Sequence, residues 1–455
     1  MPVTGWAGRA VVVAGAGASG EAAARALLRL GARVTVVDRA ASARTDGLVA
    51  AGASLALGAE AAPAGTELLV ASPGWRPDSP LLTAAAVAGI EVIGEVELAW
   101  RLRGPGPAPW LALTGTNGKT TTVRMLESML RAAGERTVAT GNVGLPVVDA
   151  VLATPPYDVL AVELSSFQLH SAPSVRPAAA AMLNLAPDHL DWHGGFEAYA
   201  AAKELIWAGP ETVAVGNADD PEVAGRLLKA PGRQVTFTLG APAGDQLGIA
   251  DGTLTDRAFG GGALAPVAEI RPAGPHNVAN ALAAAALARA HGVGPGAIRQ
   301  GLRDFVPDRH RNERVAEVAG VTYVDDSKAT NPHAAAASLT SYEPVVWIAG
   351  GLLKGAPVDE LVAAVAPRLA GAVLLGADRG VLAAAIARHA PSLPVVTVSR
   401  TDDGAMSEVV EAAAGLARAG DTVLLAPAAA SMDMFRDYGA RGDAFAAAVR
   451  ALAGP

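Results

Sequence analysis

The residues best suited to chemistry in this 455-residue chain stand in one short stretch, Leu111-Ala-Leu-Thr-Gly-Thr-Asn-Gly-Lys-Thr-Thr-Thr122. It predicts an apolar strand, a glycine-rich turn and a helix. Gly115 and Gly118 let the backbone bend so that successive N–H groups and the positive end of the helix face one anion. Lys119 adds a positive charge and Thr120 a hydroxyl for Mg²⁺. The stretch therefore predicts a phosphate-binding loop (P-loop) for a nucleotide.

The full P-loop pattern has a further glycine at the end of the strand, where this chain has Leu113. The alternative interpretation is an ordinary strand-to-helix turn with a surface lysine. Three consecutive threonines from Thr120 argue against it, because β-branched residues are weak helix formers and their hydroxyls are better explained by a ligand.

A second glycine-rich turn, Gly15-Ala-Gly-Ala-Ser-Gly20, lies between an expected strand at 10–14 and an expected helix at 21–30. Asp38 ends the next strand, at the spacing of a ribose-binding acid, and Arg39 is typical of NADP selection. No hydride-transfer site is evident further on, and the same turn holds the diphosphate of any nucleotide. We interpret it as a nucleotide-diphosphate site of unassigned base, with Ser72-Pro-Gly74 as a tight turn at the ligand edge.

Length and composition narrow the class of protein. A chain of 455 residues exceeds one hydrophobic core, so two or three domains are expected. No apolar run approaches the roughly 18 residues of a membrane span, and no signal peptide is evident, which predicts a soluble cytoplasmic protein. A net charge of −8 gives no footprint for nucleic acid, and the absence of cysteine excludes disulfides and thiolate metal sites.

Apolar strands alternate with helical segments along the chain, which predicts an α/β fold of parallel sheets. Three domains are expected: a Rossmann-like domain at 1–104, a P-loop domain at 105–307 and a second Rossmann-like domain at 308–455. The stretch Arg103-Gly-Pro-Gly-Pro-Ala-Pro109 is typical of a linker. Further strands are expected at 67–71, 90–92, 159–163, 180–185, 212–216, 321–325, 345–349, 372–375, 395–398 and 422–426, a helix at 196–207 and a β region at 234–265.

Polar residues follow several of these strands. Glu163 ends an apolar strand next to the P-loop strand, and Mg²⁺ prefers such oxygen ligands. His189 is ambiguous alone, although the adjacent Asp188 favours a site. Asn277 is most simply an N-cap of the helix that begins near Gly274, while Asn280 lies one turn further on the same face, so that the two amides can project toward a ligand.

The motifs together resemble the Mur ligases, the ATP-dependent amide-forming family of peptidoglycan synthesis. The resemblance covers almost the whole chain and rests on Gly115-Thr-Asn-Gly-Lys-Thr120, Gly141-Asn-Val-Gly144, Glu163-Leu-Ser-Ser-Phe-Gln-Leu169, Asp188-His189, Lys203, His276-Asn-Val-Ala-Asn-Ala-Leu282, His310-Arg311, Asp325-Asp-Ser-Lys-Ala-Thr-Asn331 and Ser431. No Asp-Asn-Pro-Arg signature of the diamino-acid-adding members is present. Asp326-Ser-Lys-Ala-Thr330 is similar to the D-glutamate-adding type.

The resemblance implies an acyl-phosphate mechanism with ATP, two Mg²⁺ ions and a carbamylated Lys203. The implied catalytic residues are Lys119, His189, Lys203 and Lys328. The implied metal ligands are Thr120, Glu163, His189 and Lys203. The implied ATP-binding residues are Gly115, Thr116, Asn117, Gly118, Lys119, Thr120, Thr121, Asn277, Asn280, Arg311 and Asp326.

Two further sets follow from the resemblance. UDP-N-acetylmuramoyl-L-alanine is expected at Gly15, Gly17, Ala18, Ser19, Asp38, Arg39, Ser72, Gly74, Asn142, Ser165 and Gln168. D-Glutamate is expected at Thr330, Lys354, Ser431 and Tyr438, where Tyr438 replaces the usual Phe and Leu352-Leu353 replaces more polar residues. A monomer without nucleic-acid or membrane partners is expected.

Three alternative functions stay open at this point. A folylpolyglutamate synthase shares the P-loop and the carbamylated lysine but does not need the N-terminal unit. An NAD(P)-dependent oxidoreductase would use Gly15–Gly20 and leaves Lys119, Glu163 and Lys203 unexplained. A non-catalytic nucleotide-binding regulator is excluded only by turnover.

Overall fold

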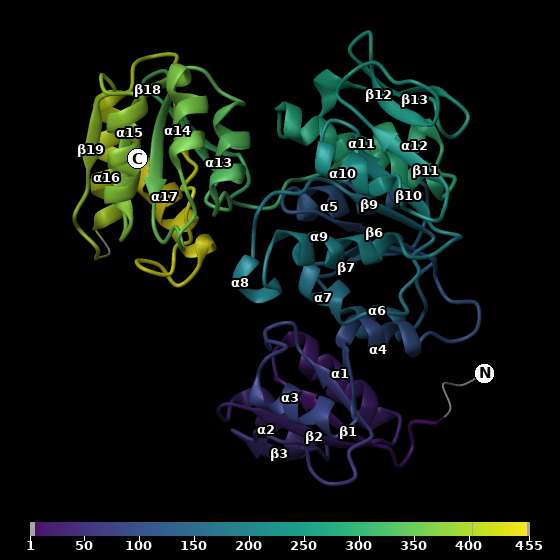
Figure 1. The fold of residues 1–455 in the computed structure, drawn as a ribbon. Helices are drawn as coiled ribbons and strands as arrows, with labels where there is room; N and C mark the ends of the chain where they lie inside the picture. Colours follow the sequence, from purple (N-terminus) through teal and green to yellow (C-terminus); the bar gives the residue numbers. More distant parts are fainter. Residues whose placement is uncertain (1–4, 403, 453–455) are drawn as a thin grey trace. The chain divides into compact units, whose positions relative to one another are not determined.

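The structure is a computed structural model that describes residues 5–402 and 404–452 (Figure 1). Its three β-sheets are flanked by helices, which confirms the predicted α/β fold. The chain divides into two compact units. The first unit holds residues up to 270 together with 279–305, and the second holds 271–278 together with the residues from 306 onward.

The N-terminal sheet is entirely parallel, in the order β3-β2-β1-β4-β5. Its strands are β1 (Ala10–Ala14), β2 (Arg33–Asp38), β3 (Ser54–Leu57), β4 (Leu68–Ala71) and β5 (Glu91–Gly94). The helices are α1 (Ala18–Arg29), α2 (Ala43–Ala50), α3 (Pro80–Val87) and α4 (Glu95–Arg101). Strand β3 was not predicted from the sequence, because this edge strand has only four residues and none of them is fully buried.

The central sheet has nine strands, in the order β14-β13-β12-β11-β10-β9-β6-β8-β7. They are β6 (Trp110–Thr114), β7 (Thr137–Gly141), β8 (Val159–Glu163), β9 (Ala179–Met182), β10 (Val213–Asn217), β11 (Gln234–Phe237), β12 (Gln246–Ala250), β13 (Thr253–Asp256) and β14 (Gly262–Pro266). The strands from β6 to β12 pair in parallel, and β13 and β14 add an antiparallel edge.

Helices join the central strands. They are α5 (Lys119–Ala132), α6 (Val147–Val151), α7 (Ser166–His170), α8 (Leu190–His193), α9 (Phe196–Glu204), α10 (Pro221–Leu227), α11 (Pro275–Ala290) and α12 (Pro295–Asp304). Every residue of β6, β8 and β9 is buried, which explains why these strands appear in the sequence as continuous apolar runs. Because these strands are parallel, the segments after Thr114, Glu163 and Met182 emerge at one edge of the sheet.

The C-terminal sheet has the order β15-β16-β20-β17-β18-β19, with only β15 antiparallel to its neighbour. Its strands are β15 (Glu313–Val318), β16 (Val321–Asp325), β17 (Val345–Gly350), β18 (Leu369–Leu375), β19 (Val395–Thr397) and β20 (Thr422–Leu425). The helices are α13 (Pro332–Leu339), α14 (Asp359–Val365), α15 (Arg379–His389), α16 (Ala405–Leu416) and α17 (Tyr438–Leu452).

Two local predictions were wrong. Asn277 is not an N-cap, because α11 already begins at Pro275, whose fixed φ suits the first helical position. The helix expected at 196–207 is α9 up to Glu204, followed by a 3₁₀ turn at Leu205–Trp207. Within residues 5–402 and 404–452, no helix has both the length and the apolar character needed to cross a bilayer.

Candidate active site

The P-loop stretch has the predicted strand, turn and helix. Gly118 adopts a left-handed conformation with φ of 80°, and α5 begins directly after it. A Cβ atom at Gly118 would lie 2.4 Å from Oδ1 of Asn280, so the side chain of Asn280 approaches the loop where only glycine fits. The Lys119 ammonium donates to the carbonyl oxygens of Gly115 and Thr116, both at 2.9 Å.

Two side chains that the sequence reading did not single out fasten this loop. The Asn184 amide accepts from Asn117 N at 2.8 Å and donates to Asn117 O at 3.1 Å. The hydroxyls of Thr116 and Tyr199 lie 2.9 Å apart, and Tyr199 is buried. Asn184 gave a usable signal, since it is a polar residue just beyond an apolar strand, whereas Tyr199 lies within a helix and gave none.

Glu163 ends β8 with 1% of its surface exposed. Its Oε1 accepts from Asn142 Nδ2 at 2.9 Å, while the buried Oε2 has no hydrogen-bond partner among the described residues. A buried carboxylate oxygen without a partner is costly unless a cation or donor completes it. Its oxygen is the kind of donor that Mg²⁺ prefers, so Glu163 fits the expected metal.

Lys203 reaches the same edge from α9 and is only 2% exposed. Its ammonium donates to Gly115 O at 2.9 Å and to Thr114 Oγ1 at 3.2 Å. Burial, and next the positive charge of Lys119, hold the pKa of Lys203 well below its usual value. Lys203 is therefore a buried amine held against the P-loop.

His189 stands just before α8 in a left-handed conformation with φ of 52°. Its ring packs against Phe167 with centroids 4.7 Å apart, and its Nε2 lies 3.5 Å from Oδ2 of Asp188. Burial lowers the pKa of His189, Asp188 raises it, and the charges of Lys119 and Lys203 lower it further. His189 is therefore near enough to Lys119 and Lys203 for their charges to lower its pKa, and its role beside them stays a prediction.

The N-terminal glycine-rich turn is held by the residues expected to serve it. Asp38 Oδ2 accepts from Ala16 N at 2.7 Å, and Oδ1 accepts from Arg39 N at 2.6 Å. Ser72 Oγ donates to Gly15 O at 3.2 Å. A Cβ atom at Gly20 would lie 1.8 Å from Gly15 O, so glycine is required for α1 to pack closely on the turn.

In the C-terminal sheet, the segment after β16 carries the expected polar residues. Asp326 is buried and accepts from Asn312 N at 3.3 Å, and burial raises its pKa to about 6 although Arg311 opposes the rise. The Lys328 ammonium lies 3.9 Å from the centroid of the Tyr438 ring. Lys328, implied to be catalytic, and Tyr438, expected to bind D-glutamate, are therefore in contact.

Three family models match successive parts of the chain: the Mur ligase MurD-like N-terminal domain at 9–94, the Mur ligase middle domain at 113–288 and the Mur ligase glutamate ligase domain at 310–429. A UDP-N-acetylmuramoylalanine–D-glutamate ligase from Streptomyces avermitilis is 59% identical over 99% of this chain and all of its own length. This chain belongs to the Mur ligase family.

Other comparisons agree with this assignment. The Mur ligase of the same name from Thermobifida fusca is 60% identical over 98% of this chain and 99% of its own. The solved UDP-N-acetylmuramate-alanine ligase of Thermotoga maritima covers 97% of this chain and 99% of its own, with a TM-score of 0.59 at 17% identity, and so shares the fold. The predicted family and three-part architecture are confirmed.

In this Mur ligase, several expected substrate contacts have structural partners. Ser165 and Gln168 form a reciprocal capping box at the start of α7, with Ser165 N donating to Gln168 Oε1 at 2.9 Å. The Asn142 amide is bonded to Glu163, and the Asn277 amide lies 2.9 Å from His276 Nε2. Their contacts with a ligand stay predictions.

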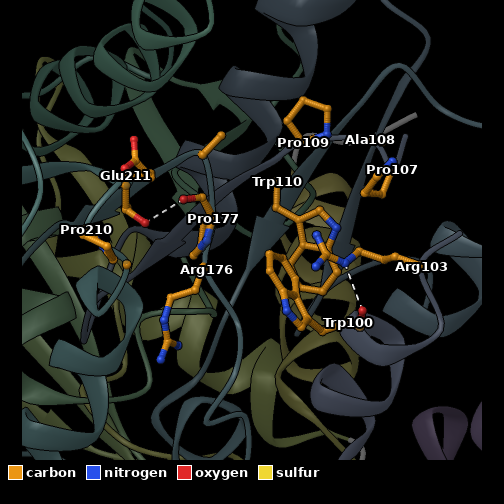
Figure 2. A pocket seen from close by; sticks show the side chains of 13 residues that line it. Trp100, Arg103, Pro107, Ala108, Pro109, Trp110, Arg176, Pro177, Pro210 and Glu211 are labelled. Carbon is orange, nitrogen blue, oxygen red and sulfur yellow. Dashed lines mark hydrogen bonds between the residues drawn. The ribbon is translucent and has the colours of Figure 1, made fainter. Parts of the chain in front are cut away.

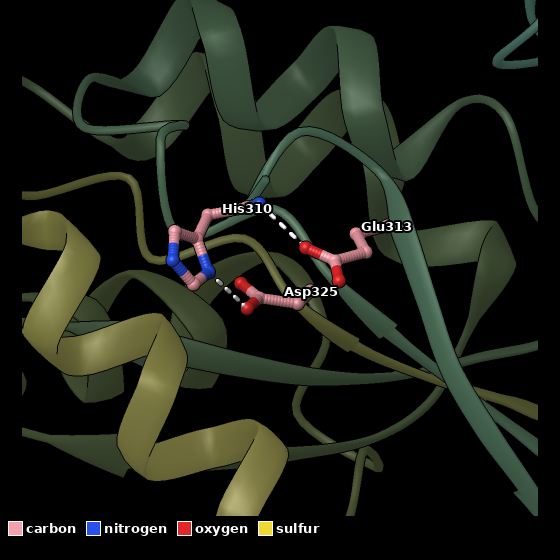
Figure 3. Close-up of side chains that lie close together, drawn as sticks. All are labelled: His310, Glu313 and Asp325. Carbon is pink, nitrogen blue, oxygen red and sulfur yellow. Dashed lines mark hydrogen bonds and ion pairs between the residues drawn. The ribbon is translucent and has the colours of Figure 1, made fainter. Parts of the chain in front are cut away.

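A His–Glu–Asp cluster supports the segment after β16 (Figure 3). Ligand atoms of His310, Glu313 and Asp325 lie within 4.8 Å of one another. However, His310 Nδ1 pairs with Asp325 Oδ2 at 2.7 Å and His310 N donates to Glu313 at 2.9 Å, so these groups satisfy one another. His310 O in turn accepts from Lys328 N at 3.2 Å, which makes the cluster a brace for that segment.

The sequence reading also missed Arg441, which is 1% exposed. Its guanidinium donates to Ser327 Oγ and Ser327 O, both at 2.9 Å, and to Ala429 O at 3.1 Å. Burial lowers the pKa of Arg441 to about 10. The side chain thereby joins the segments after β16 and β20, and no local pattern could have shown this. Of the residues expected for D-glutamate, Ser431 is buried, while Lys354 is exposed and has φ of 53°.

Proposed function

We propose that this Mur ligase joins D-glutamate to UDP-N-acetylmuramoyl-L-alanine and converts ATP to ADP and phosphate. The observation that carries the proposal is the grouping of Lys119 and Lys203 on Gly115 O, beside Glu163 with its buried Oε2. The choice of D-glutamate rests on the curated relatives of that name at about 60% identity. An NAD(P)-dependent oxidoreductase would leave this grouping unused.

The reaction proceeds in two steps. The terminal phosphoryl group of ATP passes to the alanyl carboxylate, which forms an acyl phosphate as the bond to ADP breaks. The neutral amine of D-glutamate then attacks the acyl carbon, phosphate leaves, and the nitrogen loses a proton as the amide forms. Lys119 and the P-loop amides stabilise negative charge on the transferred group.

Two Mg²⁺ ions fit the donors at this edge. Thr120 and Glu163 are assigned to one, and His189 and Lys203 to the other. When bound, Mg²⁺ would neutralise negative charge on the phosphate oxygens. We assign Lys203 as a carbamate, because a buried amine with a lowered pKa is neutral enough to take up CO₂ and the product offers anionic oxygens.

The remaining assignments follow the expected sets. Asn277 and Asn280 serve adenine, Arg311 and Asp326 the ATP phosphates and ribose, and Lys328 the reacting phosphate. The Gly15–Gly20 turn with Asp38 and Ser72 serves UDP, and Thr330, Lys354, Ser431 and Tyr438 serve D-glutamate. We further propose that the protein acts in the cytoplasm as a monomer without nucleic-acid or membrane partners, with domain boundaries near 104 and 307.

Phosphate release tests the proposal. With ATP, Mg²⁺ and UDP-N-acetylmuramoyl-L-alanine, D-glutamate should stimulate release, whereas L-glutamate, L-alanine and diaminopimelate should not. Equal stimulation by another amino acid would reassign the substrate. Calorimetric titration should also show binding of the UDP-sugar and none of NADPH, and tight NADPH binding would contradict the assignment of the N-terminal turn.

A further inference from the structure

A cavity of about 270 Å³ lies away from the proposed site (Figure 2). Four segments line it: the end of α4 with the following linker, the start of β6, the residues before β9 and the residues before β10. We call it the tryptophan cavity, after Trp100 and Trp110. Because β6, β9 and β10 are parallel neighbours, the cavity lies at their amino ends. The P-loop lies at the opposite edge of the sheet, since it follows the carboxyl end of β6.

Aromatic side chains form one wall of the tryptophan cavity. The rings of Trp100 and Trp110 meet edge to face, with centroids 4.9 Å apart and planes at 83°. Trp110 is 1% exposed, and its indole N–H has no hydrogen-bond partner among the described residues. A buried indole N–H normally finds an acceptor, but this one is enclosed within the wall, so what the wall offers a ligand is apolar surface.

Positive charge is the second property of the tryptophan cavity. The Arg103 guanidinium lies over the Trp100 ring, and Figure 2 shows the Arg103 side chain reaching the two indoles. Arg176 lies on the lining too, where Gly209 leaves room for it, since a Cβ there would be 3.0 Å from Arg176 Cδ. Within residues 5–402 and 404–452, no carboxylate pairs with either arginine, and both donate to backbone carbonyls.

Burial makes the positive charge of Arg103 energetically unfavourable. Burial alone lowers the pKa of Arg103 to about 10, which leaves the guanidinium charged at neutral pH but poorly solvated. The lining residues include two arginines, Arg103 and Arg176, and one acid, Glu211, which is exposed. Their net charge is therefore +1. An anion placed beside Arg103 would restore the interactions that burial removes.

We propose that the tryptophan cavity binds a small ligand that joins a planar ring to a carboxylate or phosphate group. The ring packs on the apolar lining, which includes Trp100 and the prolines of the linker, and the anionic group accepts from Arg103. A dry cavity of roughly 150 Å³ holds benzene, so 270 Å³ admits a ring and one anionic group. This site is independent of the proposed reaction, because no residue assigned to ATP, UDP or D-glutamate lines it.

Ligand-observed NMR on the full chain tests the site, with benzoate and phenyl phosphate as probes. Saturating Mg²⁺, adenylyl imidodiphosphate and UDP occupy the proposed nucleotide sites during the titration. Binding is expected near 1 mM, roughly what so few atoms support. Benzamide, which lacks the charge, and acetate, which lacks the ring, should bind at least tenfold more weakly. Binding of either aromatic anion supports the site, and their ratio identifies the preferred anionic group.

Two variants locate the binding. R103Q removes the charge and should weaken benzoate roughly tenfold. The matched control is R136Q, because Arg136 also lies over an aromatic ring, that of Tyr157, at 5.0 Å, outside the cavity. Thermal unfolding establishes that each variant is folded. Equal binding of benzoate and benzamide, undiminished binding in R103Q, or no binding at 20 mM would overturn the proposal.

Discussion

The two glycine-rich turns of this Mur ligase share a backbone and differ in side chains. Each follows a buried parallel strand and leads into a helix, with α1 after Gly17 and α5 after Gly118. At the first turn, the nearby carboxylate of Asp38 accepts from the backbone N–H of Ala16 in the turn and from that of Arg39, which follows Asp38. In the second, two lysines converge on Gly115 O.

The difference between the two turns distinguishes phosphate binding from phosphoryl transfer. Backbone N–H groups and a helix N-terminus are enough to hold phosphate, and the first turn offers little more. Phosphoryl transfer also needs positive charge and metal ligands where negative charge shifts. The second turn has Lys119, Lys203 and the Oε2 of Glu163, which lacks a partner in the described part of the chain, for that purpose. Four predictions can break or sharpen this contrast.

The largest expected effect comes from Lys203, which has no counterpart at the first turn. K203A should lower turnover roughly 10²- to 10³-fold, the scale for loss of a preorganised charge contact. Acetate or formate should restore part of the activity by supplying carboxylate oxygens, as phosphate-release assays would show. K229A, which changes an exposed lysine, serves as the control. Near-normal activity of K203A or K203R would remove Lys203 from the transfer site.

Next in size is the close packing of the first turn. G20A places a Cβ 1.8 Å from Gly15 O, so the turn must move; overpacking of this kind costs about 1–3 kcal/mol. We expect a lower melting temperature and at least tenfold weaker UDP-sugar binding by calorimetry, with ATP binding retained. G225A is the control, because a Cβ at Gly225, on α10 and outside the assigned sites, also meets nothing within 4 Å. If G20A and its control bind the UDP-sugar equally well, close packing at Gly20 does not determine the affinity of this turn.

A smaller effect is expected from Asp38. In D38N one of the two acceptor oxygens becomes a donor, so one of the N–H groups of Ala16 and Arg39 loses its partner. A lost bond to a charged group is worth about 1.5–3 kcal/mol, only part of which falls on substrate binding, so the KM for the UDP-sugar should rise by less than about tenfold. Steady-state kinetics should show kcat within twofold of the parent, as for the exposed D46N control. A fall in kcat alone would give the first turn a part in transfer.

The smallest effect on turnover is expected at Glu95, the first residue of α4, which joins that helix to α6. It follows β5, and its Oε1 accepts from Val148 N at 2.7 Å. Burial raises the pKa of Glu95 to about 7 from 4.5, so the folded state binds its proton more tightly than the unfolded chain. This group's contribution to stability therefore falls as pH rises from about 4.5 to 7, by on the order of 3 kcal/mol.

The variant E95Q keeps the acceptor and removes the titration. Compared with the parent, it should gain relative stability as the pH is raised from 5 to 7.5, measured by urea unfolding at several pH values. Turnover at neutral pH should stay within twofold. Parallel pH profiles for the two proteins would show that Glu95 does not titrate in this range.

The sequence alone determined the features that depend on local pattern. Two glycine-rich turns, buried apolar strands and polar residues at strand ends follow from chain periodicity, because parallel strands bring their carboxyl ends to one edge. Glu163 and the P-loop were found in this way. The motif order also identified the family, which the comparisons confirmed.

Only the tertiary structure decided which side chains are buried and what they contact. Lys203 stands on a helix of ordinary composition, and its burial against Gly115 depends on how α9 packs. Tyr199 and Arg441 depend likewise on partners fixed by folding. The stretch 103–109 looked like a plain linker, yet folding sets Arg103 over Trp100. Burial and pairing across long sequence separations follow from packing, which local patterns do not encode.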